Sequence, residues 1–155
     1  ANVKFSQFTN QTATPTTFVV GYDGSANVRI PSEGIAPYVQ EETFSSAGKQ
    51  TLSNSWSFIK NAVVSFVARV TAVKLSTGDS WCAILKGGAK KVSGVASVID
   101  TRTLEVFAYD AAAVNWYIVY IIGLNDEIEF SVNSLGDASA IKWRLETIFN
   151  EVSIW

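Results

Sequence analysis

The sequence predicts an all-β protein, in which an antiparallel β-sandwich of about seven or eight strands follows a small N-terminal β-element and a linker. Short apolar segments rich in β-branched and aromatic residues recur between Gly, Asn and Asp turns along residues 57–155. Several of them alternate apolar and polar residues with a period of two, which is typical of strands with one buried face. We therefore expect an N-terminal segment (1–31), a linker (32–56) and a sandwich domain (57–155).

The N-terminal segment contains two strand-like pieces, FVVGYDG (18–24) and NVRIP (27–31). The residues before them are rich in Thr, Asn and Gln, so this segment is too polar to build a core of its own. Its strand edges have few partners within the chain, and we expect a neighbouring chain to supply them. Residues 32–56 carry Pro37 and many Ser and Thr residues, which predicts a linker with one helical turn.

The first long strand of the domain is predicted at residues 62–72, where the even positions are all apolar. These positions are Ala62, Val64, Phe66, Ala68, Val70 and Ala72. The sequence STGD (76–79) predicts a turn, and SWCAILKG (80–87) predicts a second strand that ends at Gly87 and Gly88. A weaker strand is expected in KKVSGVAS (90–97).

Further strands are predicted at TLEVFAY (103–109), NWYIVYII (115–122) and EIEFSVN (127–133). The last of these alternates clearly, which indicates one buried face and one face in water. Residues 141–155 also fit helical spacing, but a helix would place Trp143 on its polar side. We therefore favour a final strand there.

The sequence does not support an enzyme, because it contains no His, the commonest general base and metal ligand. Gly78-Asp79-Ser80 resembles the nucleophile block of GDS-type esterases, but without His to activate the Ser we interpret it as a hairpin turn. Glu127 and Glu129 share a strand face; a calcium or glycosidase site there is the alternative to the solvated face that we favour. Residues 87–91 lack the spacing of a P-loop. We expect no catalytic residue, no metal ligand and no cofactor.

Composition also limits the partners. The chain has 12 Lys and Arg against 14 Asp and Glu, and the basic residues are scattered, so we expect no nucleic-acid binding. The longest apolar run, 111–124, is shorter than the ~20 residues that a membrane-spanning helix needs, which predicts a soluble protein with no membrane insertion. The single cysteine, Cys82, lies in an apolar strand and is expected to pack as a small hydrophobe.

Aromatic residues are more numerous than a small core needs, which leaves open whether some of them line a sugar-binding surface. We favour packing between sheets or subunits. The residues concerned are Trp81, Trp116, Trp143, Trp155, Tyr109, Tyr117 and Tyr120.

The C-terminal part of the chain resembles the β-domain of tail-fibre, tailspike and related virion proteins of tailed bacteriophages. The shared pattern consists of a GDS turn before a Trp-bearing strand, a small-residue run before another Trp strand, an alternating strand and a final strand with Trp and a Glu-Val pair. In this sequence the pattern falls on 78–81, 110–116, 127–132, and Ile141, Trp143, Glu151 and Val152. The resemblance covers most of residues 57–155. The KFSQF piece (4–8) and the GYDG…NVRI pieces resemble the short attachment segment of the same proteins.

This resemblance implies a structural virion protein, made in the host bacterial cytoplasm and assembled into the phage tail. The most direct expectation is a short homotrimeric tail fibre that attaches to the host cell surface; a capsid decoration protein is the alternative. Its partners would be a baseplate or tail adaptor, or the capsid, and a host surface glycan or protein. Expected virion anchors are Phe5, Phe8, Phe18, Val20 and Ile30. Expected subunit-interface residues, chosen as outward-facing apolar strand positions, are Val63, Val67, Tyr117, Val119 and Ile121.

Overall fold

The computed structural model describes residues 18–22, 27–31 and 37–154. The chain divides into two compact units, Ala1–Pro37 and Tyr38–Trp155. In the first unit, β1 (Phe18–Tyr22) and β2 (Asn27–Pro31) pair antiparallel, as the sequence predicts for a small N-terminal β-element. None of the helices in the described residues is long and apolar enough to cross a membrane.

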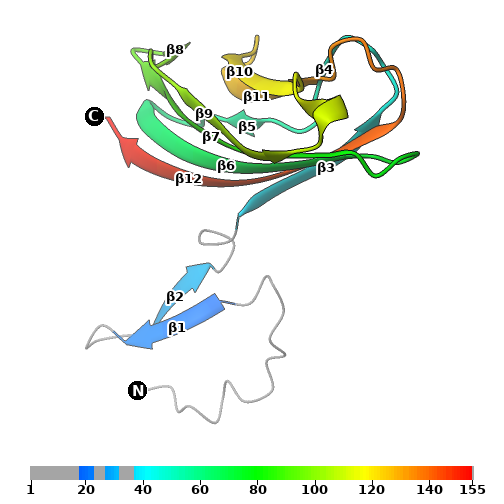
Figure 1. Ribbon diagram of the computed structural model, residues 1–155. Helices are drawn as coiled ribbons and strands as arrows, with labels where there is room; N and C mark the ends of the chain where they lie inside the picture. Colours follow the sequence, from blue (N-terminus) through cyan, green and yellow to red (C-terminus); the bar gives the residue numbers. More distant parts are fainter. Residues whose placement is uncertain (1–17, 23–26, 32–36, 155) are drawn as a thin grey trace. The chain divides into compact units, whose positions relative to one another are not determined.

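The second unit confirms the predicted sandwich. An antiparallel sheet of six strands faces an antiparallel sheet of four strands (Figure 1). In the large sheet, β12 lies between β3 and β6, and β7 continues on the far side of β6 with β8 and β9 paired to it. The strands of this sheet are β3 (Tyr38–Phe44), β6 (Ala62–Lys74), β7 (Ser80–Val92), β8 (Val95–Val98), β9 (Thr103–Tyr109) and β12 (Ile141–Ser153). In the small sheet, β11 (Glu127–Asn133) pairs with β10 (Tyr117–Ile122), β4 (Lys49–Thr51) and β5 (Trp56–Ser57).

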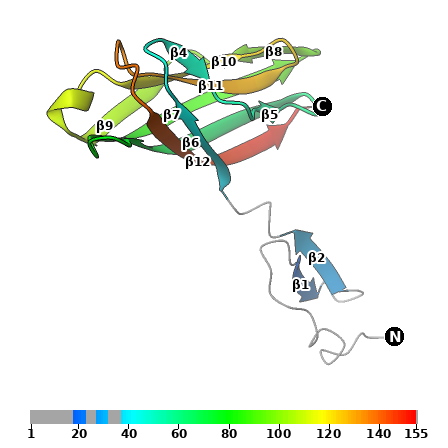
Figure 2. The ribbon, with the colours of Figure 1, turned by 90° about the vertical axis from the view of Figure 1, so that its right-hand side faces the viewer.

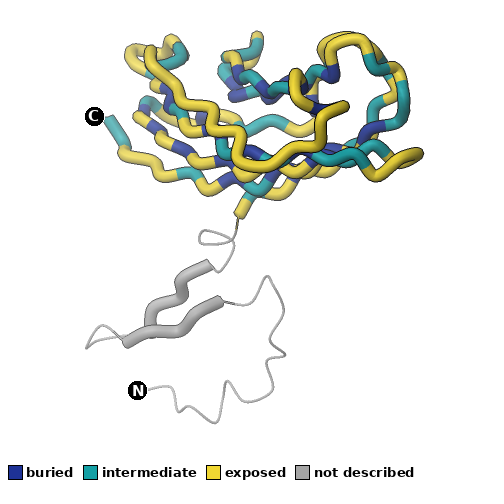
Figure 3. The backbone as a smooth tube through the Cα atoms, in the orientation of Figure 1, coloured by how far each residue is buried: buried dark blue, intermediate teal, exposed yellow. Residues whose placement is uncertain are grey.

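The long strands β6 and β12 form the centre of the large sheet, where they pair along their whole length (Figure 2). All the even positions predicted to face inward in β6, from Ala62 to Ala72, are buried. In β12, the alternate residues Ile141, Trp143 and Leu145 are buried. Figure 3 colours the backbone by burial and shows buried and exposed positions along the strands of the large sheet. The predicted strand at this end of the chain is thus confirmed, and the helical alternative is wrong.

Aromatic side chains fill the space between the sheets in two groups. At one end, Trp143 packs against Trp81 and Trp116, with ring centroids 5.8 and 5.7 Å apart. Further along, Phe66 from the large sheet packs edge-on against Tyr120 and Phe130 from the small sheet, at 4.8 and 5.4 Å. The interpretation of these aromatic residues as packing groups is therefore correct for the three buried tryptophans and Tyr120.

The stretch expected to be a linker contributes strands to the sandwich. The strand β3 pairs with Ile141–Thr147 of β12, while β4 and β5 pair with β11. The sequence of β3 shows no clear apolar–polar alternation, because two of its inward positions are polar. Gln40 donates a hydrogen bond to the carbonyl of Asn54, and Glu42 accepts hydrogen bonds from the backbone and hydroxyl of Ser53. A boundary near residue 57 would thus cut through the domain.

The strand predicted to stop at Gly87 and Gly88 continues to Val92, and the hairpin turn follows at Ser93 and Gly94. Gly87 has a packing role instead. A Cβ atom there would lie 2.3 Å from the hydroxyl oxygen of Tyr120, which comes from the opposite sheet. Gly87 lets the two sheets approach closely at this point, and neither glycine ends the strand.

Candidate functional site

The outer face of the large sheet carries two exposed apolar register pairs, which the polar pair Ser65 and Asn150 separates. Along β6 and β12, register pairs Val63 with Val152 and Val67 with Ile148. Their side chains are exposed by 36, 64, 41 and 62%, respectively. We call these four residues the apolar patch. On β7, Lys86 and Lys90 lie opposite Val67 and Val63, so the apolar patch consists of two aliphatic pairs with polar neighbours.

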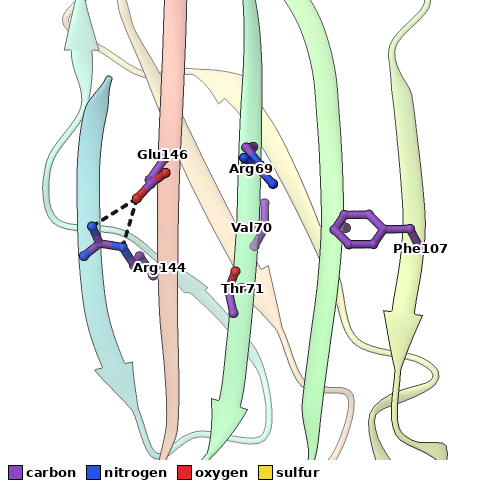
Figure 4. A pocket seen from close by; sticks show the side chains of 7 residues that line it. Arg69, Val70, Thr71, Phe107, Arg144 and Glu146 are labelled. Carbon is purple, nitrogen blue, oxygen red and sulfur yellow. Dashed lines mark hydrogen bonds and ion pairs between the residues drawn. The ribbon is translucent and has the colours of Figure 1, made fainter. Parts of the chain in front are cut away.

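Further along the same face, beyond Val67 and Ile148, the outward side chains of β6 and β12 are polar or charged. The outward residues here are Arg69 and Thr71 on β6 and Arg144 and Glu146 on β12. Arg69 lies opposite Glu146, and Thr71 lies opposite Arg144. Together with Phe107 of β9 they surround an open hollow of about 260 Å³, whose floor lies at Val70 and Ala83 (Figure 4). We call this feature the charged hollow.

Phe107 reaches the hollow because of a β-bulge. The register of β9 against β7 shifts between Cys82 and Ala83, so that Cys82 pairs with Ala108 and Ala83 with Val106. Phe107 is the extra residue of the bulge, and its ring extends from β9 across β7 toward Arg69 and Thr71 (Figure 4). The ring is 54% exposed. Bulges often redirect a side chain in this way beside functional sites.

The two arginines of the hollow differ in their partners. Arg144 donates to Glu41 of β3 at 2.8 Å and to Glu146 at 3.1 Å, and these hydrogen bonds raise the pKa of its guanidinium. Lys142 contributes a further ion pair with Glu41 at 2.7 Å, and its hydrogen bond is the main cause of the lowered pKa of Glu41. Within the described part of the chain, Arg69 takes part in no ion pair. Its guanidinium therefore remains open to a ligand.

The predicted interface residues lie on two opposite faces of the sandwich. Val63 and Val67 belong to the apolar patch on the large sheet. Tyr117, Val119 and Ile121 alternate with the buried Ile118 and Tyr120 on β10, so they lie on the outer face of the small sheet. Of these, Ile121 is exposed and the other two are half-buried. The five residues do not form one patch. The sequence reasoning missed Ile148 and Val152, which the β6–β12 register places beside Val67 and Val63.

The predicted virion anchors lie partly outside the described residues, which include neither Phe5 nor Phe8. Phe18 and Val20 lie on β1 and Ile30 on β2, with Phe18 opposite Pro31 and Val19 opposite Ile30. Val20 is opposite Arg29. The backbone pairing therefore places these three anchor positions on the paired strands β1 and β2.

The face of β11 that was expected to be in water is partly buried. Glu127 and Ser131 are buried there, because β10 lies on one side of β11 and β4 and β5 on the other. The carboxylates of Glu127 and Glu129 converge over Gly123, where a Cβ atom would lie 2.4 Å from an oxygen of each. Burial raises the pKa of Glu129, and a hydrogen bond with Glu127 raises it further.

The other chemical candidates have local structural roles. The hydroxyl of Ser80 donates to the carbonyl of Gly78, which has a φ of +80°, so the GDS segment is part of a hairpin turn. Asp110 accepts a hydrogen bond from the Ser80 backbone at 2.8 Å and so joins two of the motif blocks. Among residues 37–154 and the two N-terminal strands, no group of three or more acidic or Cys side chains is arranged to hold a metal ion.

Comparison with known proteins leaves the chain without an assigned family. No family model matches it, and no curated protein shows significant sequence similarity to it.

Proposed function

We propose that this chain is a self-associating structural protein of a tailed-phage virion, and specifically a short homotrimeric tail fibre that attaches to the host cell. The observation that carries the self-association is the apolar patch. Burial of apolar surface contributes roughly 25 cal/mol per Å². The two exposed aliphatic pairs on the central strands β6 and β12 therefore support a subunit contact at this face.

A second apolar surface on the opposite sheet supports a cyclic assembly. Ile121 is exposed there, with Tyr117 and Val119 half-buried on the same strand face. In a cyclic trimer each subunit uses two different patches, one for each neighbour, because the contacts are heterologous. Two apolar patches on different faces are thus compatible with a ring, whereas a two-fold dimer needs only one.

The placement on a phage virion is supported by the resemblance of the motif blocks described above. Those blocks have a clear physical role in this chain. Their tryptophans, Trp81, Trp116 and Trp143, meet in the core, and Asp110 ties one block to the turn of another. The shared pattern therefore consists of residues that specify a packed β-module, which is the kind of unit that a fibre protein requires.

The association is tested by light scattering coupled to size exclusion on the full chain. We expect three times the chain mass of 16.8 kDa at micromolar concentration. Val67→Lys and Ile148→Lys should each shift the protein toward monomer, because a buried contact would have to accommodate an unpaired charge. Ile59→Lys is the matched control, since Ile59 is 88% exposed but lies outside the patch. A stable monomer of the unaltered chain, or equal effects of all three changes, would reject the proposed contact.

The place on the particle is tested separately by labelling particles with an antibody against this protein. Signal at the tail supports the fibre, and signal over the whole capsid lattice supports the decoration protein. A chain shortened to begin at Pro37 retains the whole second compact unit. We expect this shortened chain to form trimers but to be absent from particles. If it joins particles as efficiently as the full chain, the N-terminal hairpin is not the anchor.

A further inference from the structure

The charged hollow has the composition of a ligand site. Two arginines and one glutamate line it, so its own charge is +1 on a chain whose net charge is −2. Glu41 and Lys142, which lie beside it, neutralise each other at 2.7 Å. A local positive charge on an acidic protein favours an anionic ligand at this position over a cationic one.

The free group that would recognise the anion is Arg69. Arg144 already donates to Glu41 and Glu146, whereas Arg69 has no ion-pair partner within the described residues. A guanidinium presents a planar set of donors that matches a carboxylate in a two-point hydrogen bond. Arg144 is held in place by its two partners and contributes positive charge without having to reorganise.

The remaining groups of the hollow match a sugar ring. Phe107 presents an exposed aromatic ring, on which the C–H face of a pyranose can lie. The hydroxyl of Thr71 and the carboxylate of Glu146 line the same hollow and can bind hydroxyl groups of the ligand. The hollow is open and has only one exposed apolar side chain in its lining, Phe107, which suits a polyhydroxylated ring better than an apolar peptide side chain.

We propose that the charged hollow binds an acidic sugar, a pyranose that carries a carboxylate. Arg69 binds the carboxylate, Phe107 supports the ring, and Thr71 and Glu146 bind hydroxyl groups. The biological meaning of this site, recognition of an acidic surface glycan, rests on the proposed attachment function. The binding itself does not, because the hollow is built within one chain.

The test uses the full chain labelled with nitrogen-15 and trigalacturonate as the probe, with its methyl ester as the matched neutral probe. We expect trigalacturonate to shift the backbone amide signals of Thr71 and Phe107, and the ester to bind at least tenfold more weakly. Arg69→Gln should weaken binding of the acid at least tenfold, and Arg69→Lys should restore only part of it, because an ammonium group cannot form the two-point contact. Lys86→Gln, which removes a positive charge at the position opposite Val67, should leave binding unchanged.

Several results would overturn the proposal. They are the absence of shifts at millimolar trigalacturonate, equal binding of the acid and its ester, and equal losses from the Arg69 and Lys86 changes. If inorganic phosphate displaces the probe at equal concentration, the hollow is a general anion site and the proposed sugar site is rejected. Circular dichroism of each variant shows whether the fold is retained. Mass and binding are measured independently. A monomer that binds the probe would therefore reject the proposed trimer and leave the proposed sugar site standing.

Discussion

The close approach of the two sheets at Gly87 makes Gly87→Ala the sharpest test of the fold. The added Cβ would lie 2.3 Å from the Tyr120 hydroxyl oxygen and 2.6 Å from two ring carbons, distances that require one sheet or the ring to move. Tyr120 is fully buried, so its ring has no solvent-filled space to enter. Its hydroxyl accepts a hydrogen bond from the Gly88 N–H at 3.2 Å and donates one to the Gly88 carbonyl at 3.3 Å.

The expected loss of stability combines two effects. Overpacking of a well-filled core costs about 1–3 kcal/mol. Displacement of the Tyr120 hydroxyl disturbs two hydrogen bonds to Gly88, each with a net value of about 0.5–1.5 kcal/mol. We therefore expect Gly87→Ala to lower the free energy of unfolding by about 2–4 kcal/mol, and Tm by roughly 5–15 °C for a domain of this size.

Denaturation in guanidinium chloride followed by tryptophan fluorescence measures this loss. Gly48→Ala is the matched control, because no atom lies within 4 Å of a Cβ at that position, and it should change stability by less than about 0.5 kcal/mol. Tyr120→Phe removes the nearest clashing atom. The double variant should therefore be more stable than the sum of the single losses predicts, by about 0.5 kcal/mol or more. An unaltered midpoint for Gly87→Ala, or additive losses, would refute the proposed packing.

Two further predictions concern pH. Burial raises the pKa of Glu129 above its ordinary 4.5, because the buried carboxylate is less well solvated than in the unfolded chain. The free energy of unfolding therefore falls as pH rises through the raised pKa. Glu129→Gln should therefore be more stable than the unaltered chain at neutral pH and lose that advantage below 4.5, as urea titrations at several pH values would show. In contrast, hydrogen bonds from Ser139 and Lys74 lower the pKa of Asp137 below 3.8. That stabilisation is present above pH 3.8 and is lost as pH falls through the lowered pKa. Asp137→Asn should therefore be less stable than the unaltered chain at neutral pH and lose less stability in acid. Parallel stability–pH profiles of the two proteins would contradict this assignment.

The parts of the fold that the sequence predicts are those in which local patterning and packing agree. The even positions of β6 are apolar and buried, and Ile141, Trp143 and Leu145 of β12 behave in the same way. The prediction failed where local composition misleads. In β3, polar Gln40 and Glu42 take inward positions, where nearby loop groups bond to the Gln40 amide nitrogen and the Glu42 carboxylate. Gly87 was interpreted as the end of a strand because its packing partner, Tyr120, is distant in sequence.

The surfaces could be predicted only in part. Val63 and Val67 were identified from alternation within one strand, but their neighbours Val152 and Ile148 depend on the register between β6 and β12. The charged hollow combines residues of four strands, β6, β7, β9 and β12, and depends on a bulge that turns Phe107 outward. Neither a register nor a bulge leaves a clear local signal in a single sequence, so the hollow could not have been found without the structure.

The position of β12 also affects the order of events in folding. This strand is the last one described along the chain, yet it lies inside the large sheet, with β3 on one side and β6 on the other. Until Ile141–Ser153 is available, β3 and β6 have no shared partner, and the edge of β6 that β12 covers is exposed. Sheets closed by such distant pairings form slowly, in milliseconds to seconds, and expose strand edges meanwhile. During synthesis, therefore, β6 keeps an unpaired edge until β12 emerges, and crowding of nascent chains at that moment favours mispairing between copies.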